Sequence, residues 1–249
     1  MKKIIMATLA IVLVVASVYY IGAVSPIPEL FHDRFFPDKT IEETGKCGED
    51  VTWTLNKKKR ELVISGKGDM WDYNNEEEKK SPFYSGYDDN VSVNDDIVSV
   101  KIEDGVTSIG DGAFESCESM TNVTIPDSVT SIGDSAFMNC TNLKNIVVPG
   151  SVTRIGNAAF SGCHSLKEFI IPDGVTSIGN FTFSSCFRLE SISIPDSVTS
   201  IGIYAFLHCD KLHDIYYYGT KEQWNAIKIN ISALGKDLET VTIHCYDDA

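Results

Sequence analysis

The stretch VTIPDSVTSIGDSAFMNC occupies residues 123–140, and a near copy, ISIPDSVTSIGIYAFLHC, occupies residues 192–209. Three more copies begin at residues 100, 146 and 169: VKIEDGVTSIGDGAFESC, IVVPGSVTRIGNAAFSGC and FIIPDGVTSIGNFTFSSC. Every copy starts 23 residues after the one before it, and YYYGT begins at residue 215, where a sixth copy would start. A fixed period of this length predicts a solenoid, in which each unit buries its apolar side against its neighbours.

Within one repeat, the apolar residues predict three sides. Val123 and Ile125 alternate with Thr124, which indicates a strand with two inward residues, and Pro126 ends that strand because it cannot donate to the ladder. VTSIG predicts a second short extended side, and SAFMNC suits a helical turn on the third side. Each coil should bury about seven apolar groups, the large ones each stabilising the fold by roughly 1.5–3 kcal/mol.

These residues resemble the BspA-type leucine-rich repeats of bacterial surface proteins, whose unit reads approximately I-x-I-P-x-x-V-T-x-I-G-x-x-A-F-x-x-C-x-x-L. The resemblance covers residues 97–218, and it departs from the pattern at Glu103, where other copies have proline, and at Thr182, where they have alanine. It implies a β-rich (α/β) solenoid, a right-handed array of 23-residue repeats with an N-terminal β-hairpin cap and a C-terminal cap. It also implies a cell-surface or secreted adhesive role, and it supplies no catalytic residues.

The N-terminus predicts export. Lys2 and Lys3 precede an uncharged run that extends to Ser25, and Ile4 to Val24 is mainly apolar. This run approaches the roughly 20 residues that span a bilayer, and its small-x-small cleavage sites are mediocre. A cleaved signal peptide and an uncleaved signal anchor therefore both remain open, and either places the rest of the chain outside the cytoplasm, on the cell surface or secreted.

Composition shifts divide the chain into five parts. Residues 1–25 are the signal peptide or anchor, and 26–46, which mix prolines with charges, are expected to be a juxtamembrane spacer. Residues 47–96 are an N-terminal capping region with a β-hairpin over 51–66, and 97–218 hold the five repeats and the partial sixth. Residues 219–249 are a C-terminal cap, with a short helical pattern in GTKEQWNAIKI and a last strand in LETVTIHCY.

Charge and motifs exclude several function classes. The formal charge is −14, with 21 Lys and Arg against 35 acids, which opposes binding to nucleic acid or anionic membrane surfaces. The five histidines show no HExxH spacing, and G-x-S-x-G and phosphate-binding glycine loops are absent from the sequence. We therefore expect no enzyme activity, cofactor or metal. Two groups of polar residues are expected to be solvated and not to bind a metal ion. One consists of His208, Asp210, His213 and Asp214, and the other is YDDNVSVNDD at residues 87–96.

Five cysteines keep the 23-residue period and so should form one ladder along the solenoid. They are Cys117, Cys140, Cys163, Cys186 and Cys209. Neighbouring Cβ atoms in such a ladder run parallel about 4.8 Å apart, whereas a disulfide needs about 3.8 Å and convergent vectors. Buried thiols are favoured over bridges. Cys47 and Cys245 are expected at opposite ends of the array.

The outward residues of the first strand predict a binding face of two columns. One column is polar throughout: Ser99, Asn122, Asn145, Glu168, Ser191 and Asp214. The other is apolar at its centre: Lys101, Thr124, Val147, Ile170, Ser193 and Tyr216. Val147 and Ile170 could anchor a protein or glycan partner, although β-branched residues also suit strands for reasons of propensity alone. The alternative is a structural spacer of the cell envelope with no dedicated ligand.

Overall fold

The computed structural model describes residues 42–73, 80–84, 97–230 and 241–246, all within one compact unit, Glu42–Ala249. The predicted signal segment 1–25, the spacer up to residue 41 and the acidic stretch 87–96 lie outside the described residues. Across the part of the chain that is described, no helix is long and apolar enough to span a bilayer.

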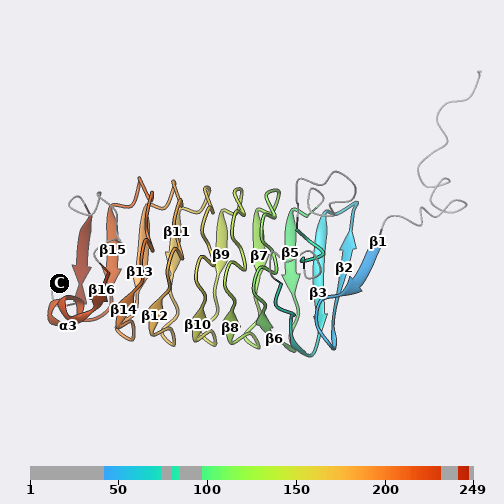
Figure 1. Cartoon of the computed structure of the whole chain (residues 1–249), viewed down its shortest axis with the longest axis horizontal. Coiled ribbons are helices and arrows are strands. Elements are labelled where there is room, and N and C mark those ends of the chain that lie inside the picture. Colours follow the sequence, from blue (N-terminus) through green and yellow to red (C-terminus); the bar gives the residue numbers. More distant parts are fainter. Residues whose placement is uncertain (1–41, 74–79, 85–96, 231–240, 247–249) are drawn as a thin grey trace, which may run out of the picture. The chain divides into compact units, whose positions relative to one another are not determined.

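Successive repeats wind into a solenoid whose equivalent strands lie side by side (Figure 1). The first strand of each repeat contributes to a long-strand face, the second to a short-strand face, and the turns after it to a third side, the turn face. The long-strand face holds β1 (Glu42–Lys46), β2 (Val51–Asn56), β3 (Glu61–Gly66), β5 (Ser99–Ile102), β7 (Asn122–Thr124), β9 (Asn145–Val147), β11 (Glu168–Ile170), β13 (Ser191–Ile194), β15 (Asp214–Tyr217) and β17 (Thr242–Cys245). The short-strand face holds β4 (Gly68–Asp69), β6 (Val106–Ile109), β8 (Ser131–Ile132), β10 (Arg154–Ile155), β12 (Ser177–Ile178), β14 (Ser200–Ile201) and β16 (Lys228–Ile229). A capped helix, α3 (Lys221–Ala226), precedes β16.

Parallel pairing in register builds the core from files of equivalent residues. We number the coils from the residue before each long strand, as coil one 98–120, coil two 121–143, coil three 144–166, coil four 167–189 and coil five 190–212. The repeated phenylalanines Phe114, Phe137, Phe160, Phe183 and Phe206 are buried and stack in sequence, with ring centroids 5.4 to 5.7 Å apart. The predicted β-rich solenoid is therefore confirmed.

At the N-terminal end of the unit, the predicted hairpin is present as β2 and β3, which pair antiparallel before β3 joins β5 in parallel. The spacer expected over 26–46 is too long, because its last five residues form β1 and pair with β2. Gly45 permits this pairing, since a Cβ there would lie only 2.6 Å from the Trp53 indole nitrogen.

The helical turn expected in SAFMNC is wrong. Ser135 and Asn139 adopt left-handed backbone conformations, with φ of 55° and 60°, and residues 23 positions away do the same. Alternating right- and left-handed residues point every second N–H in one direction along the array. The N–H groups of Ser135, Phe137 and Asn139 therefore donate to the next coil, to the carbonyl oxygens of Asn157, Ala159 and Ser161 at 2.7–2.8 Å. The turn face thus bonds one coil to the next instead of forming a helix.

Candidate interaction surface

The two predicted columns exist on the long-strand face. Strand register aligns Lys101, Thr124 and Val147 in the sheet that ends at β9. In the sheet that begins at β11 it aligns Ile170, Ser193 and Tyr216. Val147 is 80% exposed and Ile170 is 64% exposed, the two highest values for aliphatic side chains in the described chain. Neither side chain contributes to the core, so both are available to a partner.

The polar column runs beside this pair. Register pairs Asn122 with Asn145, and Glu168 with Ser191 and then Asp214. Asn145 and Glu168, which precede Val147 and Ile170 by two residues, are exposed. An exposed aliphatic pair with a polar border has the composition of a small protein-recognition patch.

At the C-terminal end of the same face, Asp214 connects two histidines. His213 Nδ1 lies 2.7 Å from Asp214 Oδ2, and His244 Nε2 lies 2.6 Å from Asp214 Oδ1. Hydrogen bonds from His244 and then His213 lower the pKa of the Asp214 carboxyl. The Tyr216 ring stacks on His244 with centroids 4.8 Å apart. Tyr216 therefore stands beside a polar cluster instead of extending the aliphatic pair.

The sequence placed His213 and Asp214 correctly in one cluster but grouped them with His208 and Asp210. Among the residues that the structure describes, no hydrogen bond or ion pair joins His208 or Asp210 to this group. The sequence did not predict that His244 joins this cluster, because His244 follows Tyr216 by 28 residues and so does not keep the 23-residue period. Alternation in TIHCY, set in register against DIYYY, could have done so.

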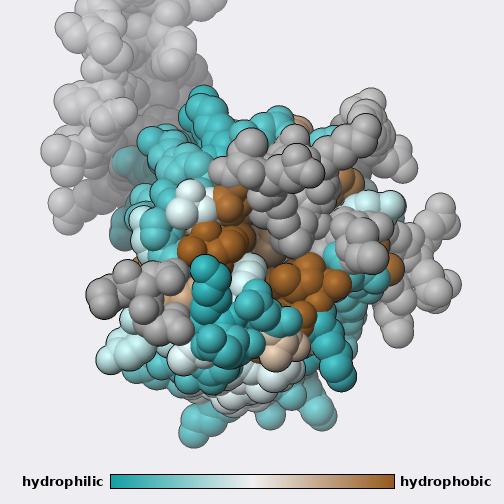
Figure 2. Space-filling view, turned by 90° about the vertical axis from the view of Figure 1, so that its left-hand side faces the viewer, coloured by the Kyte–Doolittle hydropathy of each residue, from teal (hydrophilic) through white to brown (hydrophobic). Residues whose placement is uncertain are grey.

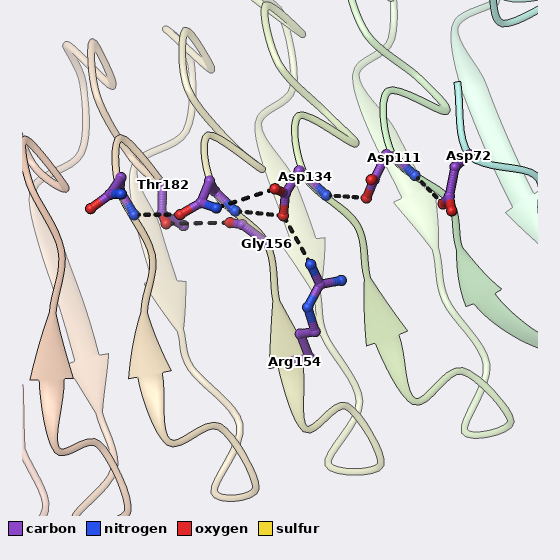
Figure 3. Close-up of polar contacts among 8 residues, drawn as sticks. Asp72, Asp111, Asp134, Arg154, Gly156 and Thr182 are labelled. Carbon is purple, nitrogen blue, oxygen red and sulfur yellow. Dashed lines mark hydrogen bonds and ion pairs between the residues drawn. The ribbon is translucent and has the colours of Figure 1, made fainter. Parts of the chain in front are cut away.

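A second polar file lies where the short-strand face meets the turn face (Figure 3). Asp72 accepts the backbone N–H of Asp111 at 3.0 Å, Asp111 accepts that of Asp134 at 2.6 Å, and Asp134 accepts that of Asn157 at 3.0 Å. The file continues through Asn157 and Asn180, whose Oδ1 atoms each accept an N–H at 2.8 Å. Each of these side chains caps a backbone donor of the next coil, so the file holds coils together.

The carboxylates of this file are engaged in capping bonds and in an ion pair. Burial, together with repulsion from Asp72 and Asp134, raises the pKa of Asp111, and Arg154 donates to Asp134 Oδ1 at 3.0 Å. Over the described ranges, no group of three or more His, Cys, Asp or Glu side chains has the arrangement that would hold a metal ion.

The cysteine ladder is buried against the phenylalanine file. The Sγ atoms of Cys140, Cys163 and Cys186 donate to the carbonyl oxygens of Phe114, Phe137 and Phe160 in the preceding coil, at 3.1, 3.3 and 3.2 Å. Burial raises the pKa of Cys163 to about 12 and that of Cys140 well above its ordinary value. A thiol held neutral in this way is a packing group and not a nucleophile.

A rival apolar surface occupies the turn face of the last complete coils. Phe181, Ile203 and Tyr204 are exposed, and the Phe181 and Tyr204 rings lie 5.3 Å apart. Figure 2, which faces the C-terminal end, shows apolar patches separated by hydrophilic side chains. These three residues are each about 40% exposed, half the value for Val147, so the long-strand pair remains the better candidate.

Comparison with known proteins identifies the repeat. A family model described as BspA type leucine rich repeat region matches residues 89–243 in six copies. A crystal structure of a leucine-rich repeat protein from Eubacterium ventriosum is similar at 30% identity, with a TM-score of 0.59 over 77% of this chain and 45% of that one. A leucine rich cell surface protein from Faecalibacterium prausnitzii shows 28% identity and a TM-score of 0.55, over 84% of this chain and 55% of that one.

The chain spans about half the length of these two proteins. A leucine rich repeat protein from T. pallidum, 23% identical with a TM-score of 0.52 over 81% of this chain and 91% of that one, shares the fold. No curated protein matches the chain. The family model covers more than half of the chain, and the strand files, phenylalanine stack and cysteine ladder follow its repeat, so the chain belongs to the BspA type leucine rich repeat family.

Proposed function

We propose that the protein is an extracellular or cell-surface interaction module whose long-strand face binds a protein partner. The observation that carries this proposal is the pair Val147 and Ile170, two aliphatic side chains more than 60% exposed on consecutive coils. Two such groups side by side leave apolar surface in water in the free protein, whereas a partner that buries them gains their transfer from water.

The family supports the class of function. Repeat arrays of this kind generally serve as scaffolds for protein interactions, and the Faecalibacterium prausnitzii relative is described as a cell surface protein. The apolar segment Ile4 to Val24 supports export and leaves open both membrane anchoring and secretion. Detection of residues 42–249 by external protease on intact cells, or in the culture medium, tests this localisation; protection from protease in intact cells would contradict it.

The binding test compares two double variants. V147K/I170K places two charges on the aliphatic pair, and T130K/T199K places two charges on the short-strand face of coils two and five, where both threonines are exposed. Wild type is first screened against purified extracellular-matrix proteins and a glycan array. We expect V147K/I170K to weaken binding about 10- to 100-fold, because buried anchor residues carry most of the binding energy. T130K/T199K should bind as wild type does.

Thermal midpoints of both variants should lie within a few degrees of wild type, since none of the four side chains is in the core. Equal binding by all three proteins would reject the long-strand pair as the docking surface. Binding to a glycan in the array would favour a glycan-binding face. Binding to nothing in either screen would favour a structural spacer of the envelope.

A further inference from the structure

Among the five coils, which the structure describes throughout, the backbone ladders are interrupted once, between coils three and four. On the long-strand face one sheet ends at β9 and another begins at β11; on the short-strand face one ends at β10 and another begins at β12. We call this interface the seam. Every other pair of adjacent coils from one to five is joined in register on both strand faces.

The missing bonds can be named by comparison with the neighbouring interfaces. Between coils four and five, the N–H groups of Glu190, Thr199 and Gly202 donate to the carbonyl oxygens of Lys167, Thr176 and Ile178 at 2.7–2.9 Å. Their equivalents at the seam are the N–H groups of Lys167, Thr176 and Gly179. Within residues 144–179, which the structure describes throughout, no backbone bond joins these three donors to coil three.

The turn face remains joined at the seam. Ala158, Phe160 and Gly162 donate to the carbonyl oxygens of Asn180, Thr182 and Ser184 at 2.8–2.9 Å. Two side-chain bonds reinforce this side, from Asn180 N–H to Asn157 Oδ1 at 2.8 Å and from the Thr182 hydroxyl to the Gly156 carbonyl at 3.4 Å (Figure 3). Thr182, the departure from the repeat noted in the sequence, is therefore a contact across the seam.

Two substitutions in coil four accompany the interruption. Phe169 stands where the other coils have valine or isoleucine, and its ring lies 4.8 Å from both Phe160 of coil three and Phe183 of coil four. This larger group fills the interior at the seam and connects the two coils there. On the short-strand face, Ser128, Ser151 and Ser197 donate their hydroxyls to valine carbonyls of the preceding coil at 2.7–2.8 Å. Gly174 replaces that serine and has no hydroxyl to donate.

Solvent exposure agrees with an opening on the strand sides. Ile146 and Val148, which flank Val147, are half-buried, whereas the equivalent residues of coils two, four and five are buried. A groove follows the seam on the short-strand face and is lined by residues 153–157 of coil three and by Thr176, Ser177 and Gly179 of coil four.

We propose that the seam is a hinge: coils three and four separate and rejoin on their strand faces while the turn face and Phe169 hold them together. The hinge is a property of the free protein. Its connection to binding rests on the proposed function, because Val147 and Ile170 lie on opposite sides of the seam. A partner that contacts both side chains selects one hinge angle, so partner binding should reduce the opening.

Amide hydrogen exchange of the full-length wild-type protein tests the hinge without any partner. We expect the amides of Lys167, Thr176 and Gly179 to have protection factors about 100-fold or more below those of Glu190, Thr199 and Gly202. The double variant F169I/G174S gives coil four the residues of coil five, Ile192 and Ser197. A serine at 174 requires only that the Thr153 methyl move slightly, since its Cβ would be 3.0 Å from that atom. In this variant the seam amides should gain the protection of their counterparts.

Motion is measured with spin labels placed across the seam on either side of the array. Labels at Lys101 and Ser193 report the long-strand face, and labels at Glu118 and Asp210 report the end of the turn face, both pairs being four coils apart, about 19 Å. The first pair should give the broader distance distribution, and F169I/G174S should narrow it. Equal protection at the seam and its neighbours in wild type, or equally narrow distributions for both pairs, overturns the hinge even if the variant fails to fold. Neither result bears on whether Val147 and Ile170 bind a partner.

Discussion

Replacing Phe160 by alanine should destabilise the protein more than any change on its surface. The Phe160 side chain is fully buried, and its ring lies 5.4 Å from Phe137, 5.7 Å from Phe183 and 4.8 Å from Phe169. Truncating a buried phenylalanine costs about 3–5 kcal/mol through lost transfer energy and the cavity left behind. Loss of the aromatic contacts, about 0.5–1.5 kcal/mol each, favours the upper half of that range.

The assay is equilibrium unfolding in urea, followed by far-ultraviolet circular dichroism and tryptophan fluorescence. Circular dichroism reports the whole array, whereas fluorescence reports its two ends, through Trp53 and Trp71 at the N-terminal end and Trp224 at the C-terminal end. Different unfolding midpoints by circular dichroism and by fluorescence would reveal that parts of the array unfold separately. The matched control is F187A. Phe187 is exposed and stacks on His164 with centroids 4.7 Å apart, so its loss should cost below about 1 kcal/mol.

A loss below about 1 kcal/mol for F160A, with an unchanged dependence on urea, would refute the reasoning. It would mean that neighbouring coils close around the vacancy and that the phenylalanine file does not carry the stability of the core.

Three further predictions concern the cysteine ladder and the file of capping side chains. Cys140, Cys163 and Cys186 should resist iodoacetamide in the native protein and react completely in non-reducing denaturant, as read by mass spectrometry; peptides linked between neighbouring coils would contradict the thiol assignment. D134A should cost about 1–2 kcal/mol, because the N–H of Asn157 and the Arg154 guanidinium both lose their acceptor, whereas D134N keeps an oxygen and should cost less than half as much; equal losses in urea unfolding would argue against the capping role. D111N should raise the thermal midpoint at pH 7, because the pKa of Asp111 is raised in the folded state and its charge is therefore unfavourable there. The gain should disappear as the pH falls through the folded pKa toward the unfolded value near about 3.9, and a gain that persists at pH 3 would exclude a charge effect.

The repeat could be predicted from the sequence because its signals are local. Alternation around Thr124 marks the first strand, Pro126 marks its end, and the 23-residue period fixes which side chains stack. The hairpin and the burial of Phe137 and Cys140 follow from the same signals.

Features that depend on contacts between coils were not predicted. The turn face was taken for a helical turn because SAFMNC has helical spacing, yet left-handed Ser135 and Asn139 direct its N–H groups to the next coil. The seam was missed because Phe169 and Gly174 each look conservative within a single repeat. Their effect arises only at the interface with coil three, where a larger ring and a missing hydroxyl coincide.

A methyl spectrum of the protein, labelled at valine and isoleucine and titrated with the partner found in the binding screen, tests the proposed function most directly. The proposal predicts that the signals of Val147 and Ile170, on the long-strand face, shift or broaden at the lowest partner concentrations. The buried methyls of Val106 and Ile109 on the short-strand face of coil one, away from the seam, should stay unchanged. Perturbation confined to Ile203 and its neighbours at the turn face, with Val147 and Ile170 unmoved, would contradict the account.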